Sequence, residues 1–156
     1  MAVASRQMAL KSKRPEADIE TLLGGTAVVY GRNARGGELP TAVREGLPFR
    51  SFEKVAEALD LRSGELSDLI GVAPRTLARR KQTKTLSAVE SDRLVGIARI
   101  ASLAEETLGS RDHARGWLRD VNRALGGVTP LSCLDTEPGR RHVEDILLRI
   151  SYGIYS

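Results

Sequence analysis

SGELSDLIGVAPRTLARRKQTK, residues 63–84, combines two short helical patterns with a glycine turn between them. Leu66 and Ile70 lie four residues apart, so both would face a core from the first helix. Gly71 can adopt the left-handed backbone that a tight turn requires, and Pro74 suits the first turn of the next helix, where a missing N–H costs nothing. This arrangement predicts a helix-turn-helix.

The segment before this motif predicts another helix of the same unit. Ser51 is expected to cap that helix and Ser63 the following one. Small Ser67, four residues before Gly71, would allow two helices to approach closely. Arg80 departs from the motif, because an aliphatic residue usually stands nine residues after the turn glycine, and this departure predicts a last helix that is short or differently tilted. The apolar residues with helical spacing after Ser51 are Phe52, Val55, Ala56 and Leu59.

The last helix of the motif carries a run of positive charge. Residues 74–84 hold five basic side chains and no acidic one. Arginine can donate two parallel hydrogen bonds to a guanine edge, while lysine suits phosphates. A solvated basic face without a partner is the alternative interpretation. The residues expected to contact DNA, with an affinity that falls steeply with salt, are Arg75, Thr76, Arg79, Arg80, Lys81 and Lys84.

Helical patterns continue to the end of the sequence. Ser87 and Glu90 have the spacing of a capping box and predict a long helix that ends at Gly109. Ser110 precedes another helix, whose apolar stripe is expected to run as far as Leu125 and to stop at the following glycine pair. The chain is therefore predicted to be mainly α, and the last helix is indicated by Val143, Ile146, Leu147 and Ile150.

The first 50 residues give weaker signals. Residues 1–20 mix basic and small residues without apolar periodicity and are expected to form a flexible basic arm. Residues 21–50 are apolar in part but broken by glycines, which leaves open whether they form a strand, a helix or a dimer contact. The helix-turn-helix is predicted over residues 51–85, and a second helical unit with a linking helix over residues 86–156.

Charge divides the chain in two. Residues 1–50 hold eight basic and five acidic side chains, residues 51–85 hold seven and five, and residues 86–156 hold nine and ten. A positive front half and a slightly negative back half suggest two surfaces with different partners, one of them nucleic acid.

Several classes of protein fit the sequence poorly. Its 156 residues suffice for one core or two small helical units. It contains neither a secretory h-region nor an apolar run that could span a bilayer, and the single Cys133 cannot form an internal disulfide, so we expect a soluble, cytoplasmic protein without membrane contact. His113 and His142 form no metal-spaced cluster with Cys133, and no phosphate loop is found. We therefore expect neither enzymatic activity nor a cofactor.

The second half of the sequence resembles a known family. In ARGWLRDVNRALGGVTPLSCLDTEPGRRHVEDILLRISYG, residues 114–153, the motifs WL, N.ALGG, PL..L.TE.G and V...L.RI.YG follow one another in the order and spacing of the Xre/MbcA/ParS-like antitoxins. The resemblance extends back to Phe52 and includes the helix-turn-helix. Two positions depart from the pattern: Cys133 stands where an aliphatic residue is common, and Val121 where a proline often precedes the asparagine.

This resemblance implies a fold, partners and an activity. The fold would be an Xre-like helix-turn-helix bundle followed by a small helical toxin-binding domain. Such antitoxins inhibit a RES-domain toxin, an NAD-consuming enzyme that degrades NAD or transfers ADP-ribose, by covering its active-site cleft. The helix-turn-helix would dimerise within an even toxin–antitoxin assembly and bind the operon's own promoter DNA. A stand-alone helix-turn-helix regulator with a C-terminal dimerisation or sensing domain is the alternative function.

The last eight residues, RISYGIYS, are unusually apolar. Ile150 and Ile154 are expected to complete the cap and the core of the last helix, with Gly153 just past its last turn. Tyrosines are amphipathic side chains that anchor interfaces, and Ser156 would add a terminal carboxylate. A purely structural tail is the alternative. By the family resemblance, the toxin-binding residues are Arg149, Tyr152, Gly153, Ile154, Tyr155 and Ser156.

Overall fold

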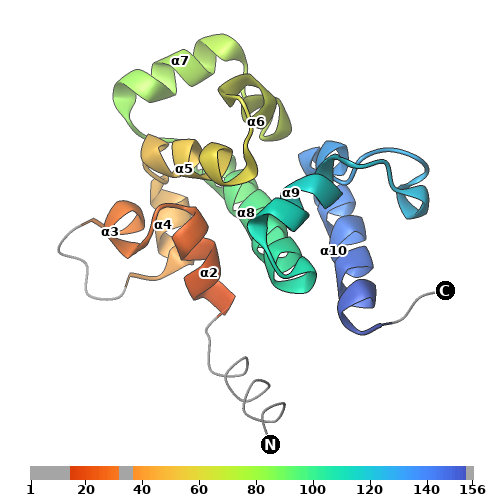
Figure 1. The fold of residues 1–156 in the computed structure, drawn as a ribbon. Coiled ribbons are helices and arrows are strands. Elements are labelled where there is room, and N and C mark those ends of the chain that lie inside the picture. Colours follow the sequence, from red (N-terminus) through yellow and green to blue (C-terminus); the bar gives the residue numbers. More distant parts are fainter. Residues whose placement is uncertain (1–14, 32–36, 154–156) are drawn as a thin grey trace, which may run out of the picture.

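The computed structural model describes residues 15–31 and 37–153, and helices form all the regular elements of this part of the chain (Figure 1). Only two isolated bridges occur there, Pro48 with Thr85 and Asn122 with Val128. The mainly α prediction is confirmed. In chain order the elements are α2 (Pro15–Leu22), α3 (Thr26–Val29), α4 (Leu39–Glu45), α5 (Phe49–Leu59), α6 (Ser63–Leu69), α7 (Pro74–Thr83), α8 (Ala88–Leu108), α9 (Arg111–Arg119), η1 (Arg123–Leu125), η2 (Leu131–Asp135) and α10 (Glu137–Ser151).

The long helix α8 lies at the centre of the molecule (Figure 1). Helices α2, α4 and α5 from the first half of the chain pack against it, and so do α9 and α10 from the second half. One connected cluster of buried apolar side chains extends from Ile19 to Leu147. The two halves therefore share one core, to which α8 contributes the buried residues Leu94, Ile97, Ala98, Ile100, Ala101 and Ala104.

Helices α5, α6 and α7 form the predicted helix-turn-helix. Leu66 and Ile70 are completely buried, as expected for the inner face of α6. Ser67 is buried as well, and its hydroxyl donates a hydrogen bond to the carbonyl of Gly64 (2.9 Å). Gly71 has a φ of 70°, the left-handed conformation that the turn required.

Two predicted helix caps are wrong. Helix α5 begins at Phe49, so Ser51 lies inside it, and the buried Ser51 hydroxyl has no hydrogen-bond partner in the described part of the chain. Ser63 is the first residue of α6 and not its cap. The N–H of Arg62 is satisfied by the carboxylate of Glu65 (2.8 Å) instead.

Helix α9 ends at Arg119 and does not continue to Leu125. The cause is Asn122, whose side-chain oxygen accepts a hydrogen bond from the N–H of Ala124 (2.9 Å) and caps the short helix η1. Val121 is consequently 71% exposed and does not continue the apolar stripe. In α10 the predicted core positions Val143, Ile146 and Leu147 are buried, while Ile150 is half-buried.

Residues 21–50, whose structure the sequence left open, are helical in part where the structure describes them. Helices α2, α3 and α4 lie there, and Leu22, Leu23, Leu39 and Leu47 join the core. The chain is already helical at Pro15, and Ile19 is buried, so residues 15–20 belong to α2 and not to an arm. Residues 1–14 lie outside the described residues. In the described ranges no helix is both long enough and apolar enough to cross a bilayer.

Candidate functional site

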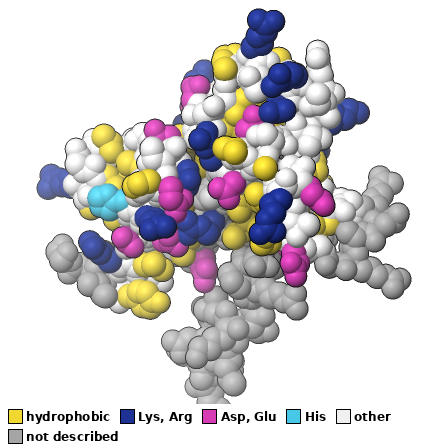
Figure 2. Space-filling model, turned by 180° about the vertical axis from the view of Figure 1, so that it is seen from behind, with side chains coloured by type: hydrophobic (Ala, Val, Ile, Leu, Met, Phe, Trp, Pro, Cys, Tyr) yellow, Lys and Arg dark blue, Asp and Glu magenta, His cyan; other side chains and the backbone are white. Residues whose placement is uncertain are grey.

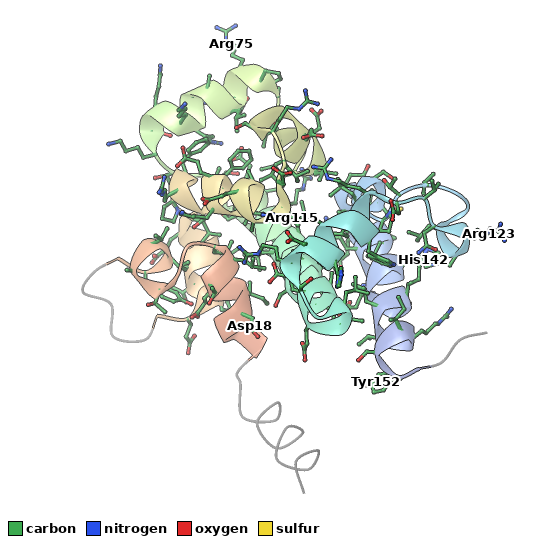
Figure 3. All side chains as sticks on the ribbon, in the orientation of Figure 1. Asp18, Arg75, Arg115, Arg123, His142 and Tyr152 are labelled. Atoms are coloured by element: carbon green, nitrogen blue, oxygen red, sulfur yellow. The ribbon has the colours of Figure 1, made fainter. Side chains whose placement is uncertain are left out.

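The first candidate surface is helix α7. Arg75, Arg79, Lys81 and Lys84 are exposed there, and Thr76 is half-buried. Lys and Arg side chains project from this upper lobe in Figure 2, and Figure 3 shows Arg75 at its tip, pointing away from the body. Within the described ranges, none of these four cations forms an ion pair with a carboxylate. Exposed and unpaired cations along one helix suit an anionic partner.

The turn into α7 is held by a residue of α8. The Arg93 guanidinium donates a hydrogen bond to the carbonyl of Ile70 at the end of α6 (3.0 Å). A Cβ atom on Gly71 would lie only 2.7 Å from the same guanidinium. The left-handed backbone conformation therefore favours glycine at this turn, and a larger residue would also displace the Arg93 guanidinium. No residue of α7 is fully buried, so contacts of this kind position the helix together with Leu77, which is packed against the core.

Arg80 does not lie on the exposed face where the sequence placed it. Its Nε donates to Oε2 of Glu90 (2.9 Å) and its Nη2 to Oε1 (3.2 Å). The side chains are 23% and 11% exposed, respectively. The pair ties α7 to the start of α8 at the position where the motif usually has an aliphatic contact. The sequence marked Arg80 as unusual, but no local pattern identified its partner.

Glu90 also takes part in the capping box at the start of α8. Its carboxylate accepts the N–H of Ser87 (2.8 Å), and the hydroxyl of Ser87 accepts the N–H of Glu90 (3.2 Å), so the predicted capping box is confirmed. Burial alone would raise the pKa of Glu90, but the hydrogen bonds from Ser87 and Arg80 outweigh it and hold this pKa below its ordinary value. The carboxylate is therefore charged at neutral pH and retains Arg80.

The second candidate surface is the end of α10. Arg149 is exposed there, and Tyr152 exposes 75% of its surface. Gly153 has a φ of 67°, and its N–H donates to the carbonyl of Ile150 (3.1 Å), which is one of the two hydrogen bonds of a Schellman ending. The predictions for residues 154–156 lie outside the described residues and stay predictions.

Polar contacts fix α10 against α8 as well as apolar ones. Arg99 of α8 and Glu144 of α10 form an ion pair at 2.6 Å. The buried Arg140 lies against Gly96, where a Cβ atom would come within 2.9 Å of its Nε. The same guanidinium donates to the carbonyl of Leu134 (2.9 Å), which joins η2 to α10. The exposed end of α10 is thus presented by a firmly held helix.

Comparison with known proteins divides the chain in the same way. Residues 38–99 match the model of the antitoxin Xre-like helix-turn-helix domain, and residues 103–153 match that of the antitoxin Xre/MbcA/ParS C-terminal toxin-binding domain. A protein of Photorhabdus laumondii named Antitoxin Xre is 32% identical over 126 residues, which are 80% of this chain and 85% of the relative. This chain belongs to the Xre/MbcA/ParS antitoxin family. An Antitoxin Xre of Pseudomonas putida is 32% identical over 117 residues, which are 74% of this chain and 72% of the relative. The Prs ADP-ribosylating antitoxin of a Sphingobium species is 24% identical over 124 residues, which are 73% of this chain and 78% of the relative.

As a member of this family, the antitoxin binds a toxin through its C-terminal domain, and the family is non-enzymatic. His113 and His142 are exposed on different helices, and Cys133 is a partly buried free thiol. No group of His, Cys, Asp or Glu side chains that could hold a metal ion occurs in residues 15–31 and 37–153.

Two arginines of the antitoxin's toxin-binding segment bind the end of α5, a contact that no sequence pattern indicated. Arg115 donates to the carbonyls of Ala58 (2.8 Å) and Glu57 (2.9 Å), and Arg119 donates to that of Asp60 (2.5 Å). Carbonyls in the last turn of a helix lack partners within it, and positive charge is favourable there. We call this the α9–α5 contact; it joins the two matched segments.

Proposed function

We propose that this antitoxin neutralises a cognate RES-domain toxin, an NAD-consuming enzyme that degrades NAD or transfers ADP-ribose, by covering its active-site cleft. The observation that carries the proposal is the match of residues 103–153 to a toxin-binding domain. This match includes the exposed turn after α10, the surface that would cover the cleft. The name of one relative, Prs ADP-ribosylating antitoxin, associates such antitoxins with ADP-ribosylation. The sequence motifs that resemble RES-linked antitoxins support the toxin class.

Inhibition by occlusion needs shape and a few strong contacts, not chemistry. A cleft is blocked when a rigidly held, exposed end covers it. Helix α10 is held through its buried face as far as Leu147, and it places Arg149 and Tyr152 beyond that point. Arginine and tyrosine are among the residue types that are enriched at the energetically dominant positions of interfaces. With Gly153, Ile154, Tyr155 and Ser156, they would form the inhibitory tip.

Removal of Gly153–Ser156 tests this mechanism. We expect the shortened antitoxin to keep its melting temperature, because the fully buried part of α10 ends at Leu147. It should no longer protect cells that express the protein encoded by the adjacent gene. Full protection by the shortened chain would leave the tail a purely structural role. If the complete chain forms no complex with the neighbouring protein, the toxin proposal fails and the regulator alternative remains.

We also propose that α7 binds promoter DNA and represses the operon. Its contacts would be Arg75 and Arg79 to base edges, with Lys81, Lys84 and Thr76 at the backbone. Arg80 is left out, since its guanidinium is held by Glu90.

The variant Arg75→Ala/Arg79→Ala should weaken promoter binding by at least about tenfold and reduce its salt dependence. Fluorescence anisotropy at several salt concentrations measures both quantities. Arg141→Ala is the matched control, because this arginine is 74% exposed on α10, away from α7. Toxin neutralisation should be unchanged in the double variant, because α7 lies outside the toxin-binding segment. Equal promoter affinity in the double variant and the wild type would mean that the basic face is only solvated surface.

A homodimer would complete the assembly. An apolar groove between α2, α4 and α8 includes the exposed Arg44 and Asp92, and neither of them forms an ion pair within the described ranges. In a two-fold arrangement each of these charges would meet its opposite on the other copy. Light scattering should show that Arg44→Asp weakens the dimer and that Arg44→Asp/Asp92→Arg restores it. The apolar residues of the groove are Ile19, Leu39, Pro40, Val43 and Val95.

A further inference from the structure

The connection between α9 and η2 contains a tightly bonded turn, residues 121–128, which we call the 121–128 turn. Its centre is Asn122, whose N–H donates a hydrogen bond to the carbonyl of Val128 (2.9 Å). The carbonyl of Asn122 accepts the N–H groups of Leu125 (3.1 Å) and Gly127 (3.0 Å). Both glycines of the turn have positive φ values. Leu125 packs against the common core, and η1 contacts α10. The turn is therefore a preformed part of the toxin-binding segment.

The outer side of this turn is apolar. Val121 is 71% exposed and Val128 45%, although the bridge between Asn122 and Val128 holds this part of the backbone in place. Four large apolar side chains are exposed in the described residues, and three of them, Val121, Val128 and Tyr152, lie in the toxin-binding segment. Apolar side chains fixed on a rigid surface lose little conformational entropy when a partner covers them. Their exposure contributes nothing to the fold of the single chain.

An unpaired arginine lies between the two valines. Of the seven arginines in residues 103–153, five donate a hydrogen bond to a carboxylate or a carbonyl. The other two, Arg123 and Arg149, have no such partner in the described residues and are exposed. Figure 3 shows Arg123 pointing away from the body on the side of α10. The free arginines of this segment thus occur next to its exposed apolar side chains.

The exposed end of α10 is small compared with the surface that a stable protein complex buries. Stable protein complexes bury about 800 Å² on each partner, contributed by about 20–30 residues. In the described part of the chain, the exposed end of α10 offers Arg149, Tyr152 and Gly153 to such an interface. A second surface on the same segment would enlarge the interface, and the 121–128 turn carries the exposed valines of that segment.

We propose that the 121–128 turn is a second toxin-binding surface, in which Val121 and Val128 cover a shallow apolar patch on the toxin and Arg123 pairs with a carboxylate beside it. The inference rests on the proposed function and extends it. Because η1 and α10 pack together, the turn and the tip of α10 bind as one rigid unit. The turn supplies affinity outside the cleft, whereas the tip blocks the cleft.

Affinity for the neighbouring-gene toxin, purified as an inactive variant, tests the proposal. We expect Val121→Ser/Val128→Ser to raise the Kd by about tenfold or more and Arg123→Glu to raise it further. Val89→Ser is the matched control, because Val89 is 60% exposed but lies at the start of α8, outside the toxin-binding segment, and its Kd should equal that of the wild type. Melting temperatures should be unchanged in all three, since only exposed side chains are altered.

Three outcomes would overturn the proposal. Unchanged Kd values for both turn variants would show that the turn does not contact the toxin. A change in oligomeric state in light scattering, with the toxin Kd unchanged, would assign the turn to contacts between antitoxin copies. Absence of binding by the wild-type chain would remove the proposed function together with this extension, whereas wild-type binding with unaffected variants removes the extension alone.

Discussion

Glu90 accepts hydrogen bonds from two different elements, the N–H of Ser87 and the guanidinium of Arg80. Glu90, in the first turn of α8, thereby also anchors α7, in which no side chain is fully buried. With the Arg80 side chain 23% exposed and that of Glu90 11%, solvent screens the pair only weakly. An ion pair thus replaces the aliphatic contact that is usual at this point of the motif.

Neutralising Glu90 should destabilise the fold in a pH-dependent way. Because the folded pKa of Glu90 is below its ordinary value of 4.5, its stabilisation is fully present above this pH and is lost as the pH falls through the lowered folded pKa. Glu90→Gln should therefore lower the free energy of unfolding by about 1–3 kcal/mol at pH 7, and this difference from the wild type should shrink below pH 4.5.

Urea unfolding between pH 7 and pH 3 measures this difference. The exposed Glu106→Gln serves as the control and should have little effect at any pH. A deficit of Glu90→Gln that stays constant over the whole range would contradict the assignment of the stabilisation to the charged carboxylate.

Serine caps show what could be predicted from single residues. Ser87 was predicted correctly because Glu90 stands three residues later, which gives both partners of a capping box. Ser51 is followed at the same distance by Lys54, which cannot return the hydrogen bond, and it lies inside α5. The serine alone was an insufficient signal. The partner of Arg80 could not be predicted either, because their contact depends on the angle between α7 and α8.

The end of helix α9 and the contacts of its arginines were the features least predictable from the sequence. Its apolar stripe indicated a helix through Leu125, but Asn122 forms its own local hydrogen bond and the helix ends at Arg119. No pattern in the sequence singled out Arg115 or Arg119. Their acceptors are carbonyl groups, which carry no sequence signal, so the α9–α5 contact was visible only in the structure.

Loss of the α9–α5 contact should loosen the end of α5. In Arg115→Ala, two carbonyls lose a charged donor, which should lower the free energy of unfolding by about 1–3 kcal/mol. Hydrogen exchange should become faster at the end of α5 and in Leu61, whose N–H bonds the carbonyl of Ala56. Arg111→Ala is a control on the same helix, because Arg111 forms a surface ion pair with Glu105 that should contribute about 0–1 kcal/mol. Equal exchange in the two variants would contradict this role.

At the scale of the whole molecule, α8 makes one folding unit of two functional segments. The helix-turn-helix match ends at residue 99 and the toxin-binding match begins at residue 103. Both positions lie inside the continuous helix α8. The mainly α class and the helix-turn-helix were predictable, because local periodicity and turn residues encode them. The packing of residues 15–31 and 37–50 onto α8 was not, because glycines interrupt their periodicity and their burial depends on distant residues.

The chain should therefore unfold in a single transition. Leu147 is completely buried in α10, and Leu147→Ala should cost about 2–5 kcal/mol. The whole transition should shift to a lower midpoint, including the helices of the first half. Fluorescence of Trp117, the only tryptophan, and far-UV circular dichroism should give coinciding curves in the wild type and the variant. A second transition that the substitution leaves in place would contradict a shared core.

The α9–α5 contact also has a consequence for synthesis on the ribosome. Arg115 and Arg119 follow their acceptors by 57 to 59 residues. At about 5–20 residues per second, the ribosome needs several seconds to add them after α5 has emerged. During this interval a nascent chain lacks the donors that close α5 as well as the core residues of α8 that follow. We expect the basic helix to become firmly positioned only when the toxin-binding segment is being completed, so that a translation product cut short before α9 would present neither surface in its final form.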